Sequence, residues 1–235
     1  WQPTFAFTVP EGLRSGLYTA RLWHDEDESF APFVVRPPKG RTTAPLAFLA
    51  STATYTAYAN IQWSMLNEKA EMRMGALPVL DAEDVTLYER PELGLSAYDL
   101  HGDGSPVYYA TRLRPCLNWA PKTGLWSFNA DTHVTDWLEA KGIAYDAISD
   151  DDLHAEGVGL LAGYRAVMTG AHPEYWSTPM WQAMTAYLNG GGRLMYLGGN
   201  GFYWRIAFHP ELPGVIEVRR AETGARYWAA EPGAY

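Results

Sequence analysis

The 235-residue chain lacks several common features, and each shortage excludes a class of protein. It holds one cysteine, Cys116, so neither an internal disulfide nor a zinc cluster built on cysteines is possible. No run of about 18 apolar residues occurs, so no segment has the pattern of a transmembrane helix. Acidic residues outnumber basic ones by 27 to 18, and the net charge of −9 argues against nucleic acid as the main partner. A single thiol is compatible with the reducing cytoplasm, where we expect the protein to be.

Apolar and aromatic residues are plentiful instead. Apolar residues make up 47% of the chain and charged residues 19%, which allows a sizeable core. The aromatic fraction is 14%, with ten Trp and fifteen Tyr. Such rings usually fill a core and its rim, and composition alone favours that interpretation. They also suit a pocket walled by rings in which some phenols take part in chemistry.

The first 45 residues have the pattern of short strands followed by a linker. Apolar and polar residues alternate over residues 4–9 and 16–23, as in half-buried strands, and a third apolar segment follows at residues 29–36. We expect residues 1–36 to be the last strands of a β-sandwich whose beginning lies outside this chain. Residues 37–45 are rich in Pro, Gly and Thr and predict a linker.

From Leu46 onward, strands alternate with helices. Compact apolar segments predict strands at residues 46–50, 143–149, 164–170 and 193–197. Amphipathic segments with helix start and stop signals predict helices at residues 132–142 and 177–189. The alternation indicates an α/β layered domain with a parallel sheet over residues 46–235, cut short at its C-terminal end. The order of elements resembles the flavodoxin-like fold of glutamine amidotransferases.

Polar residues follow the ends of these predicted strands. In open α/β sheets, ligands bind outside the carboxyl ends of the strands, so His172, Glu174 and Asn200 are expected to converge. The first strand leads into a segment that carries Tyr55 and Tyr58. A buried glutamate needs a proton, a cation or a metal. The alternative is a loop in which His172 is a core group and Glu174 stabilises the start of the next helix.

A nucleophile is missing from this predicted edge. The segment LMYLGGNGFYW resembles a strand–turn–helix elbow, but the residue at the elbow is Asn200, which is no nucleophile. Cys116 is interpreted as an inert core thiol, so the Cys–His chemistry of glutamine amidotransferases is excluded. His101 and Asp103 could bind a metal, but the glycines at positions 102 and 104 favour a solvent-exposed turn. The three aspartates at residues 150–152 resemble a cation site only by their charge, and a solvated helix start is the favoured interpretation.

Four segments together resemble one family. In order and spacing, STATYTAYAN, GLSAYDLHGDG, TGAHPEYWS and LGGNGFYWR are similar to the large subunit of N,N-dimethylformamidase. The resemblance covers most of residues 45–235 and extends into the strands before them. It implies hydrolysis of N,N-dimethylformamide to dimethylamine and formate by an amidotransferase-like α/β domain. It also implies one ferric iron per chain, a small helical partner subunit and an oligomer of that heterodimer.

The resemblance assigns roles residue by residue. It makes Glu174 the carboxylate ligand of the iron and Tyr98 one of the two tyrosine ligands. Tyr58 is the expected second tyrosine, with Tyr55 as an alternative. Ferric iron is a hard ion that prefers oxygen donors, and two phenolates and a carboxylate balance its three charges. The sequence does not decide between iron and zinc.

The same resemblance makes His172 and Asn200, together with Glu174, the catalytic residues. His172 is expected to pass a proton to the leaving amine, and Asn200 to hold the substrate or the tetrahedral oxyanion. The alternative is a non-catalytic amidotransferase-like module that binds a ligand or a carbohydrate on an aromatic surface. The enzyme interpretation requires the oxygens of Tyr58, Tyr98 and Glu174 to meet at one point.

Overall fold

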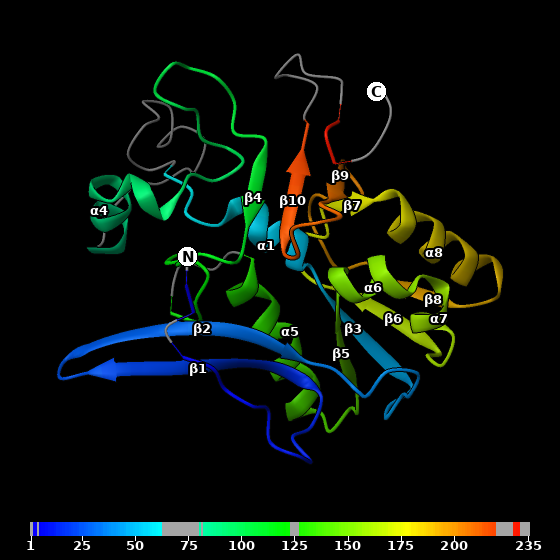
Figure 1. Ribbon diagram of the computed structural model, residues 1–235. Coiled ribbons are helices and arrows are strands. Elements are labelled where there is room, and N and C mark those ends of the chain that lie inside the picture. The colour runs from blue at the N-terminus through cyan, green and yellow to red at the C-terminus, as the bar shows by residue number, and fades with distance from the viewer. Residues whose placement is uncertain are drawn as a thin grey trace.

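The computed structural model describes residues 2–3, 5–62, 80, 82–122, 127–219 and 228–230. It shows a parallel sheet with helices on both faces, a second sheet beside it and an N-terminal hairpin below (Figure 1). Among these residues, no helix is long and apolar enough to cross a membrane.

The parallel sheet is the centre of the structure. Its strands are β3 (Leu46–Ala50), β5 (Asp146–Ser149), β6 (Ala166–Thr169) and β8 (Arg193–Met195). All pair in parallel, in the spatial order β5-β3-β6-β8. The four strands expected from the sequence are therefore confirmed. The three strands β3, β5 and β6 are almost entirely buried, which explains their continuous apolar sequences.

Helices cover both faces of this sheet because alternate residues of its strands point in opposite directions. On one face, Ala47 and Leu49 pack with α6 (Asp150–Glu156), α7 (Val158–Leu161) and α8 (Thr178–Asn189). On the other face, Phe48 and Ala50 pack with α5 (Phe128–Ala140) and the hairpin (Figure 1). The predicted layered α/β architecture is confirmed at this level.

Two helices begin as their sequences indicate. The hydroxyl of Ser177 accepts a hydrogen bond from the backbone N–H of Met180 at the start of α8. At the start of α6, Ser149 and Asp152 form a reciprocal capping box. The acidic residues 150–152 therefore begin a helix, as expected, but the prediction of a solvated start is wrong for Asp150, which is buried and accepts a hydrogen bond from the N–H of Ala53.

A second sheet was not expected from the sequence. Its spatial order is β4 (Tyr109–Thr111), β10 (Val215–Val218), β9 (Trp204–Phe208) and β7 (Tyr175–Ser177). The first three strands are antiparallel, and β7 pairs in parallel with β9. Between β3 and β4 in the sequence lie α1 (Thr52–Tyr58), α4 (Ala82–Glu89) and the 3₁₀ helix η1 (Pro91–Leu93).

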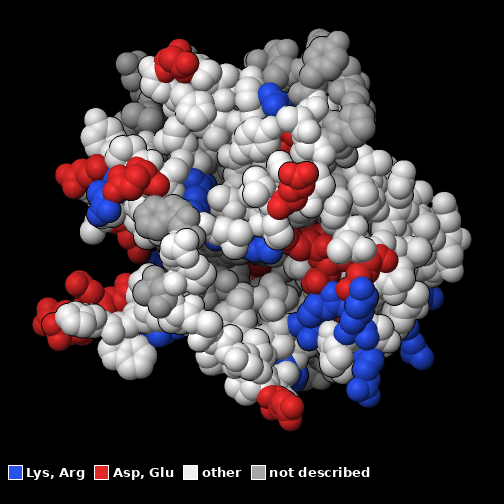
Figure 2. Space-filling view, in the orientation of Figure 1, with Lys and Arg blue, Asp and Glu red and all other residues white. Residues whose placement is uncertain are grey.

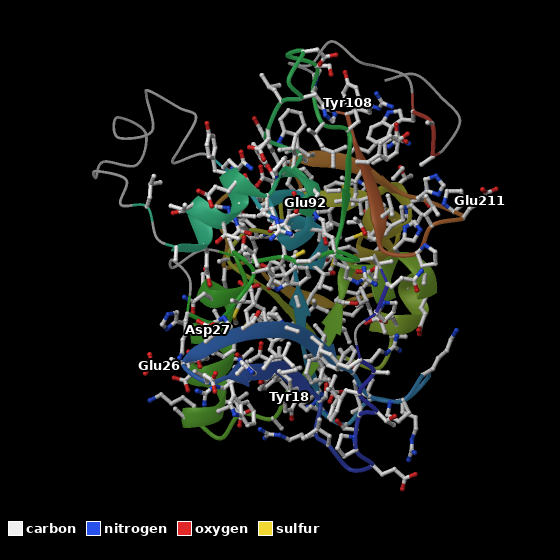
Figure 3. The ribbon with its side chains drawn as sticks, turned by 60° about the vertical axis from the view of Figure 1, so that its left-hand side comes forward. Tyr18, Glu26, Asp27, Glu92, Tyr108 and Glu211 are labelled. Atoms are coloured by element: carbon white, nitrogen blue, oxygen red, sulfur yellow. The ribbon has the colours of Figure 1, made fainter. Side chains whose placement is uncertain are left out.

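The N-terminal segment forms one hairpin of β1 (Gly16–His24) and β2 (Asp27–Val35), paired antiparallel along their whole length. Its tip carries acidic side chains, with Glu26 and Asp27 labelled in Figure 3. In the space-filling view of Figure 2, acidic side chains gather at this tip, whereas the rest of the face shown mixes both charges. The predicted strand at residues 4–9 is wrong: residues 5–9 form no strand and are exposed, and Thr4 lies outside the described residues. An alternating pattern forms a strand only with a partner strand, and no described segment pairs with residues 5–9.

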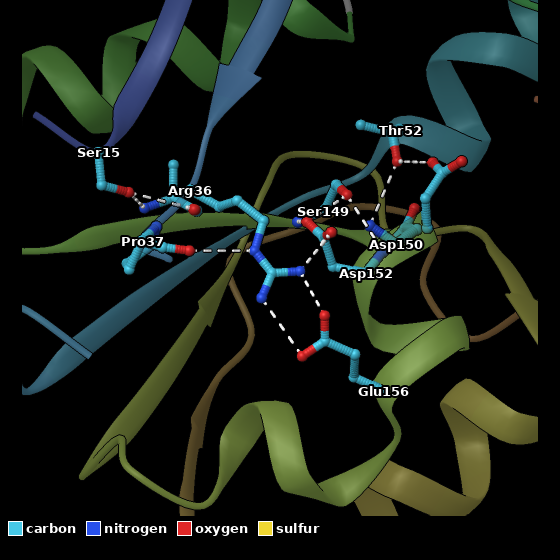
Figure 4. Close-up of polar contacts among 10 residues, drawn as sticks. Ser15, Arg36, Pro37, Thr52, Ser149, Asp150, Asp152 and Glu156 are labelled. Carbon is cyan, nitrogen blue, oxygen red and sulfur yellow. Dashed lines mark hydrogen bonds and ion pairs between the residues drawn. The ribbon is translucent and has the colours of Figure 1, made fainter. Parts of the chain in front are cut away.

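Polar contacts attach the hairpin to the parallel sheet (Figure 4). The guanidinium of Arg36 lies 2.6 Å from the carboxylate of Asp152 and 2.7 Å from that of Glu156, both on α6. A second nitrogen of Arg36 donates to Glu156 at 3.3 Å, so this pair is bidentate. The hydroxyl of Ser15 accepts a hydrogen bond from the backbone N–H of Ala147 in β5 at 2.8 Å.

Replacing Arg36 is expected to loosen this attachment. Arg36→Ala should lower the free energy of unfolding by about 1–3 kcal/mol, because two partly buried carboxylates lose their cation. Arg21→Ala is the matched control, since Arg21 also pairs with a glutamate, Glu28, but its side chain is 62% exposed. That control should change stability by no more than about 0.5 kcal/mol. Urea denaturation of both variants measures the difference, and equal effects would contradict a structural role for Arg36.

Candidate active site

The predicted site lies at the edge of the parallel sheet where the order of successive strands reverses. The adjacent strands β3 and β6 end at the same edge, with β3 leading into α1 and β6 into residues 170–174. The next parallel strand after β3 is β5, on one side of this pair, and the next after β6 is β8, on the other side. Ligands of open α/β sheets bind outside the carboxyl ends of the strands at such a switch point.

Three side chains meet at this edge. The hydroxyl of Tyr58 donates to one carboxylate oxygen of Glu174 at 3.0 Å, and the hydroxyl of Tyr98 donates to the other at 3.3 Å. The two phenol rings stack with their centroids 4.2 Å apart. Glu174 is only 1% exposed. The hydroxyls of both tyrosines therefore lie within hydrogen-bonding distance of the same buried carboxylate.

Tyr55 lies elsewhere, although it shares α1 with Tyr58. Its hydroxyl donates to the carboxylate of Asp131, and its ring packs edge-on against Trp119 and Phe128. Of the two tyrosines that the sequence left open, Tyr58 is the one hydrogen-bonded to Glu174. The reason is geometric, since residues three apart on a helix still project at different angles.

Burial sets the protonation of the phenols. It raises the pKa of Tyr58 well above its ordinary value, and the neighbouring Tyr98 and Glu174 raise it further. Burial also raises the pKa of Tyr175, whose hydroxyl donates to that of Tyr98 at 2.5 Å. Without a cation these phenols stay protonated, whereas a cation among the oxygens would favour phenolate.

The segment that carries His172 and Glu174 is held by its backbone. The N–H of Glu174 is 3.2 Å from the hydroxyl oxygen of Thr54 on α1, and its carbonyl accepts from Tyr203 and Trp204. These contacts fix the glutamate between α1 and the chain that enters β9. A group positioned in this way on rigid elements keeps its geometry when a ligand arrives.

His172 lies beside the glycine-rich turn that follows β8. Its ring packs against Gly199, where an added Cβ would come within 2.8 Å of a ring carbon. The N–H of Gly199 also donates to the carbonyl of Ala171 at 2.8 Å, which ties the two segments together. Burial lowers the pKa of His172, so its imidazole is neutral at neutral pH.

Asn200 is placed differently from the other predicted site residues. It is exposed, and its side chain forms no hydrogen bond with any residue that the structure describes. Its neighbour Gly199 contacts His172, so Asn200 borders the site while its side chain stays outside the cluster of oxygens.

Two other groups remain outside the site. His101 and Asp103 are exposed in a turn closed by a hydrogen bond from Gly104 to His101, which confirms the solvent-exposed turn. Among the described residues, no group of three or more His, Cys, Asp and Glu side chains is arranged to hold a metal.

Comparisons with known proteins identify the family of the chain. A family model described as "N,N-dimethylformamidase beta subunit-like, C-terminal" matches residues 1–235. The chain belongs to this family. The resemblance inferred from the four sequence segments is thereby confirmed.

Two members of the family can be compared in detail. The chain is 43% identical over 241 residues to the N,N-dimethylformamidase beta subunit of Alcaligenes sp and 42% identical to that of Paracoccus aminophilus. Each match covers 100% of this chain and 32% of the relative. The chain thus spans about a third of the length of these relatives.

Sequence reasoning missed two residues beside the family's site segments. The sequence gives Tyr175 no role of its own, yet its hydroxyl contacts that of Tyr98. Asp131 in the first turn of α5 is fully buried, and it accepts a hydrogen bond from the N–H of Ala171 at 2.5 Å. An aspartate at a helix start is common, so no local signal distinguishes Asp131 from an ordinary helix-start residue.

Asp131 gives a pH-dependent signature of this buried region. Burial raises the pKa of Asp131 from 3.8 to about 6. The folded state therefore favours the neutral carboxyl, and this contribution to stability is complete below about pH 4 and lost as pH rises through about 6. The stability of the wild type relative to Asp131→Asn should fall by ~3 kcal/mol between about pH 4 and pH 7.

Chemical denaturation across this pH range measures the difference. Asp136→Asn is the matched control, because Asp136 lies on the same helix but is exposed. Its difference from the wild type should stay nearly constant with pH. A constant difference for Asp131→Asn as well would show that Asp131 keeps an ordinary pKa in the fold.

Proposed function

We propose that this chain forms the iron-binding catalytic part of an amidohydrolase of the N,N-dimethylformamidase type. The reaction is hydrolysis of the C–N bond of a small N-alkyl amide, such as N,N-dimethylformamide, to dimethylamine and formate. The observation that carries the proposal is the meeting of Tyr58, Tyr98 and Glu174 through hydrogen bonds of 3.0 and 3.3 Å. The names of the two relatives supply the substrate.

The donor set suits ferric iron. All three side chains offer oxygen, which a hard trivalent ion prefers, whereas protein zinc sites usually contain nitrogen or sulfur ligands. Two phenolates from Tyr58 and Tyr98 and the carboxylate of Glu174 would balance three positive charges. A bound Fe(III) would supply a Lewis acid that polarises the amide carbonyl and acidifies water. One ion per chain is the expected stoichiometry, because the described residues form one such cluster of phenols and carboxylate.

The protein's own side chains would manage protons and orientation. His172 is neutral at neutral pH and lies two residues before Glu174, so it suits the transfer of a proton from water to the departing amine. That transfer matters because an amide nitrogen leaves poorly as an anion. We assign Asn200, at the exposed border, to hold the oxygen of the substrate through its amide N–H groups.

A second candidate is a ligand-binding module without catalysis. Exposed rings favour it: Trp181 is 51% exposed and Tyr203 63% exposed, beside Trp176 and Phe202 in a shallow surface pocket. This pocket is not lined by Tyr58, Tyr98 or Glu174. The two functions therefore use different places, and variants of the oxygen cluster separate them.

The finer fold and the assembly are also proposals. In sequence order the parallel strands are arranged second, first, third, fourth, which is the order of flavodoxin-like sheets. We propose that residues 1–36 end a β-sandwich, that residues 37–45 link it to the α/β domain, and that this domain occupies residues 46–235.

The relatives are named beta subunits, which supports a partner subunit. We propose a small helical subunit, an oligomer of that heterodimer and a cytoplasmic location.

Iron binding can be tested by colour. Purified full-length protein should contain about one iron per chain and absorb visible light, because phenolate transfers charge to Fe(III). Tyr98→Phe should shift or remove the band, and Glu174→Gln should lower the iron content. Tyr88→Phe is the matched control, since Tyr88 is 58% exposed on α4 and should leave both unchanged. A folded protein that stays colourless and metal-free after addition of iron would refute the metal site.

The role of His172 can be separated from iron binding. His172→Gln should keep the iron content and the visible band but lower kcat for N,N-dimethylformamide about 10²–10⁴-fold, the usual effect of losing a general acid–base. Release of dimethylamine measures the rate. Unchanged kcat in an iron-loaded variant would exclude His172 from proton transfer.

A further inference from the structure

The buried carboxylate of Asp131 joins two segments that also meet at the proposed metal site. On one side it accepts a hydrogen bond from the hydroxyl of Tyr55, which projects from α1. On the other side it accepts a hydrogen bond of 2.5 Å from the backbone N–H of Ala171, in the segment that follows β6. An ionised carboxylate can only accept hydrogen bonds, and Asp131 is the acceptor in both of these contacts.

The fit around Asp131 is close. Its side chain is 0% exposed, and Gly170 lies so near its carboxylate that an added Cβ would overlap the oxygens. The backbone of residues 170–171 can therefore approach Asp131 only because position 170 is a glycine. This approach leaves the segment little freedom to shift sideways.

The same two segments carry the oxygens of the site. Tyr58 lies three residues after Tyr55 on α1, and Glu174 lies three residues after Ala171. Between these contacts, Thr54 on α1 accepts the N–H of Glu174 at 3.2 Å. The hydrogen bond from Tyr58 to Glu174 thus lies at one end of the contact between α1 and residues 170–174. The Tyr55–Asp131–Ala171 bridge lies at the other end of this contact.

We propose that Asp131 and Tyr55 are positioning residues that fix α1 against residues 170–174, so that Tyr58, Glu174 and His172 keep the geometry of the site. The inference rests on the proposed function, because it assigns the pair to that same site. Neither residue touches the oxygen cluster directly, and both act through the backbone and through α1.

A purely space-filling role would not need this chemistry. Burying a carboxylate is costly, and an apolar side chain of similar volume would fill the position without that cost. The cost is visible in the raised pKa of Asp131. What an apolar residue does not provide is an acceptor shared by the N–H of Ala171 and the hydroxyl of Tyr55.

The test compares Asp131→Leu, Tyr55→Phe and the double variant in the full-length protein with its partner subunit. Leucine has a similar volume but no acceptor. Asp136→Leu and Tyr88→Phe are the controls, since both residues are exposed. Circular dichroism first establishes that each variant is folded, and Tyr55→Phe keeps the volume of the ring if Asp131→Leu fails to fold. Hydrogen exchange of residues 170–174, iron content, the visible band, kcat and KM are then measured.

Both single variants should exchange the amide hydrogens of residues 170–174 about 10-fold faster or more, with the controls unchanged. Iron content should stay near the wild-type level, the visible band should shift, and kcat should fall about 10- to 10²-fold with little change in KM. The double variant should resemble the single ones, because both changes break one bridge. Unchanged exchange, or unchanged kcat and band with faster exchange, would overturn the positioning role.

Failure of the proposed function would look different. In that case the wild type itself would bind no iron and release no amine. The exchange of residues 170–174 requires neither iron nor activity, so it still decides whether Asp131 and Tyr55 hold the segment. Faster exchange in the variants would support the bridge, and wild-type exchange would refute it.

Discussion

The buried carboxylate of Glu174 is the constraint on which the rest of the arrangement depends. A carboxylate at 1% exposure must be neutralised or hydrogen-bonded, and this one receives the hydroxyls of Tyr58 and Tyr98. Those contacts require α1, the turn at Tyr98 and the segment after β6 to meet at one edge of the sheet. The stacking of the two phenol rings and the contact between Glu174 and Thr54 follow from the same convergence.

The fold supplies rigidity around that point. The parallel strands are covered on both faces, and α1 is buried over all seven of its residues. The hairpin is attached to α6 through Arg36. Because β3 and β6 are adjacent and parallel, two segments far apart in sequence emerge side by side. A site built on such elements needs few residues to be precise.

Sequence reasoning found the elements whose signals are local. Buried strands such as β3 have continuous apolar runs, and α8 has a capping serine, so both could be placed from sequence. The second sheet could not, because β4 and β7 have three residues each and pair with strands distant in the chain. The choice between Tyr55 and Tyr58 also depended on a tertiary partner, Asp131, which carries no local signal.

The most direct test is an anomalous-difference map, recorded at the iron absorption edge, from crystals of the full-length protein. The account predicts one peak per chain within bonding distance of the oxygens of Tyr58, Tyr98 and Glu174. A peak elsewhere in the chain, or an active protein with no peak among these residues, would contradict the assignment of the oxygen cluster. The map needs no assumption about the substrate, so it tests the site independently of the reaction.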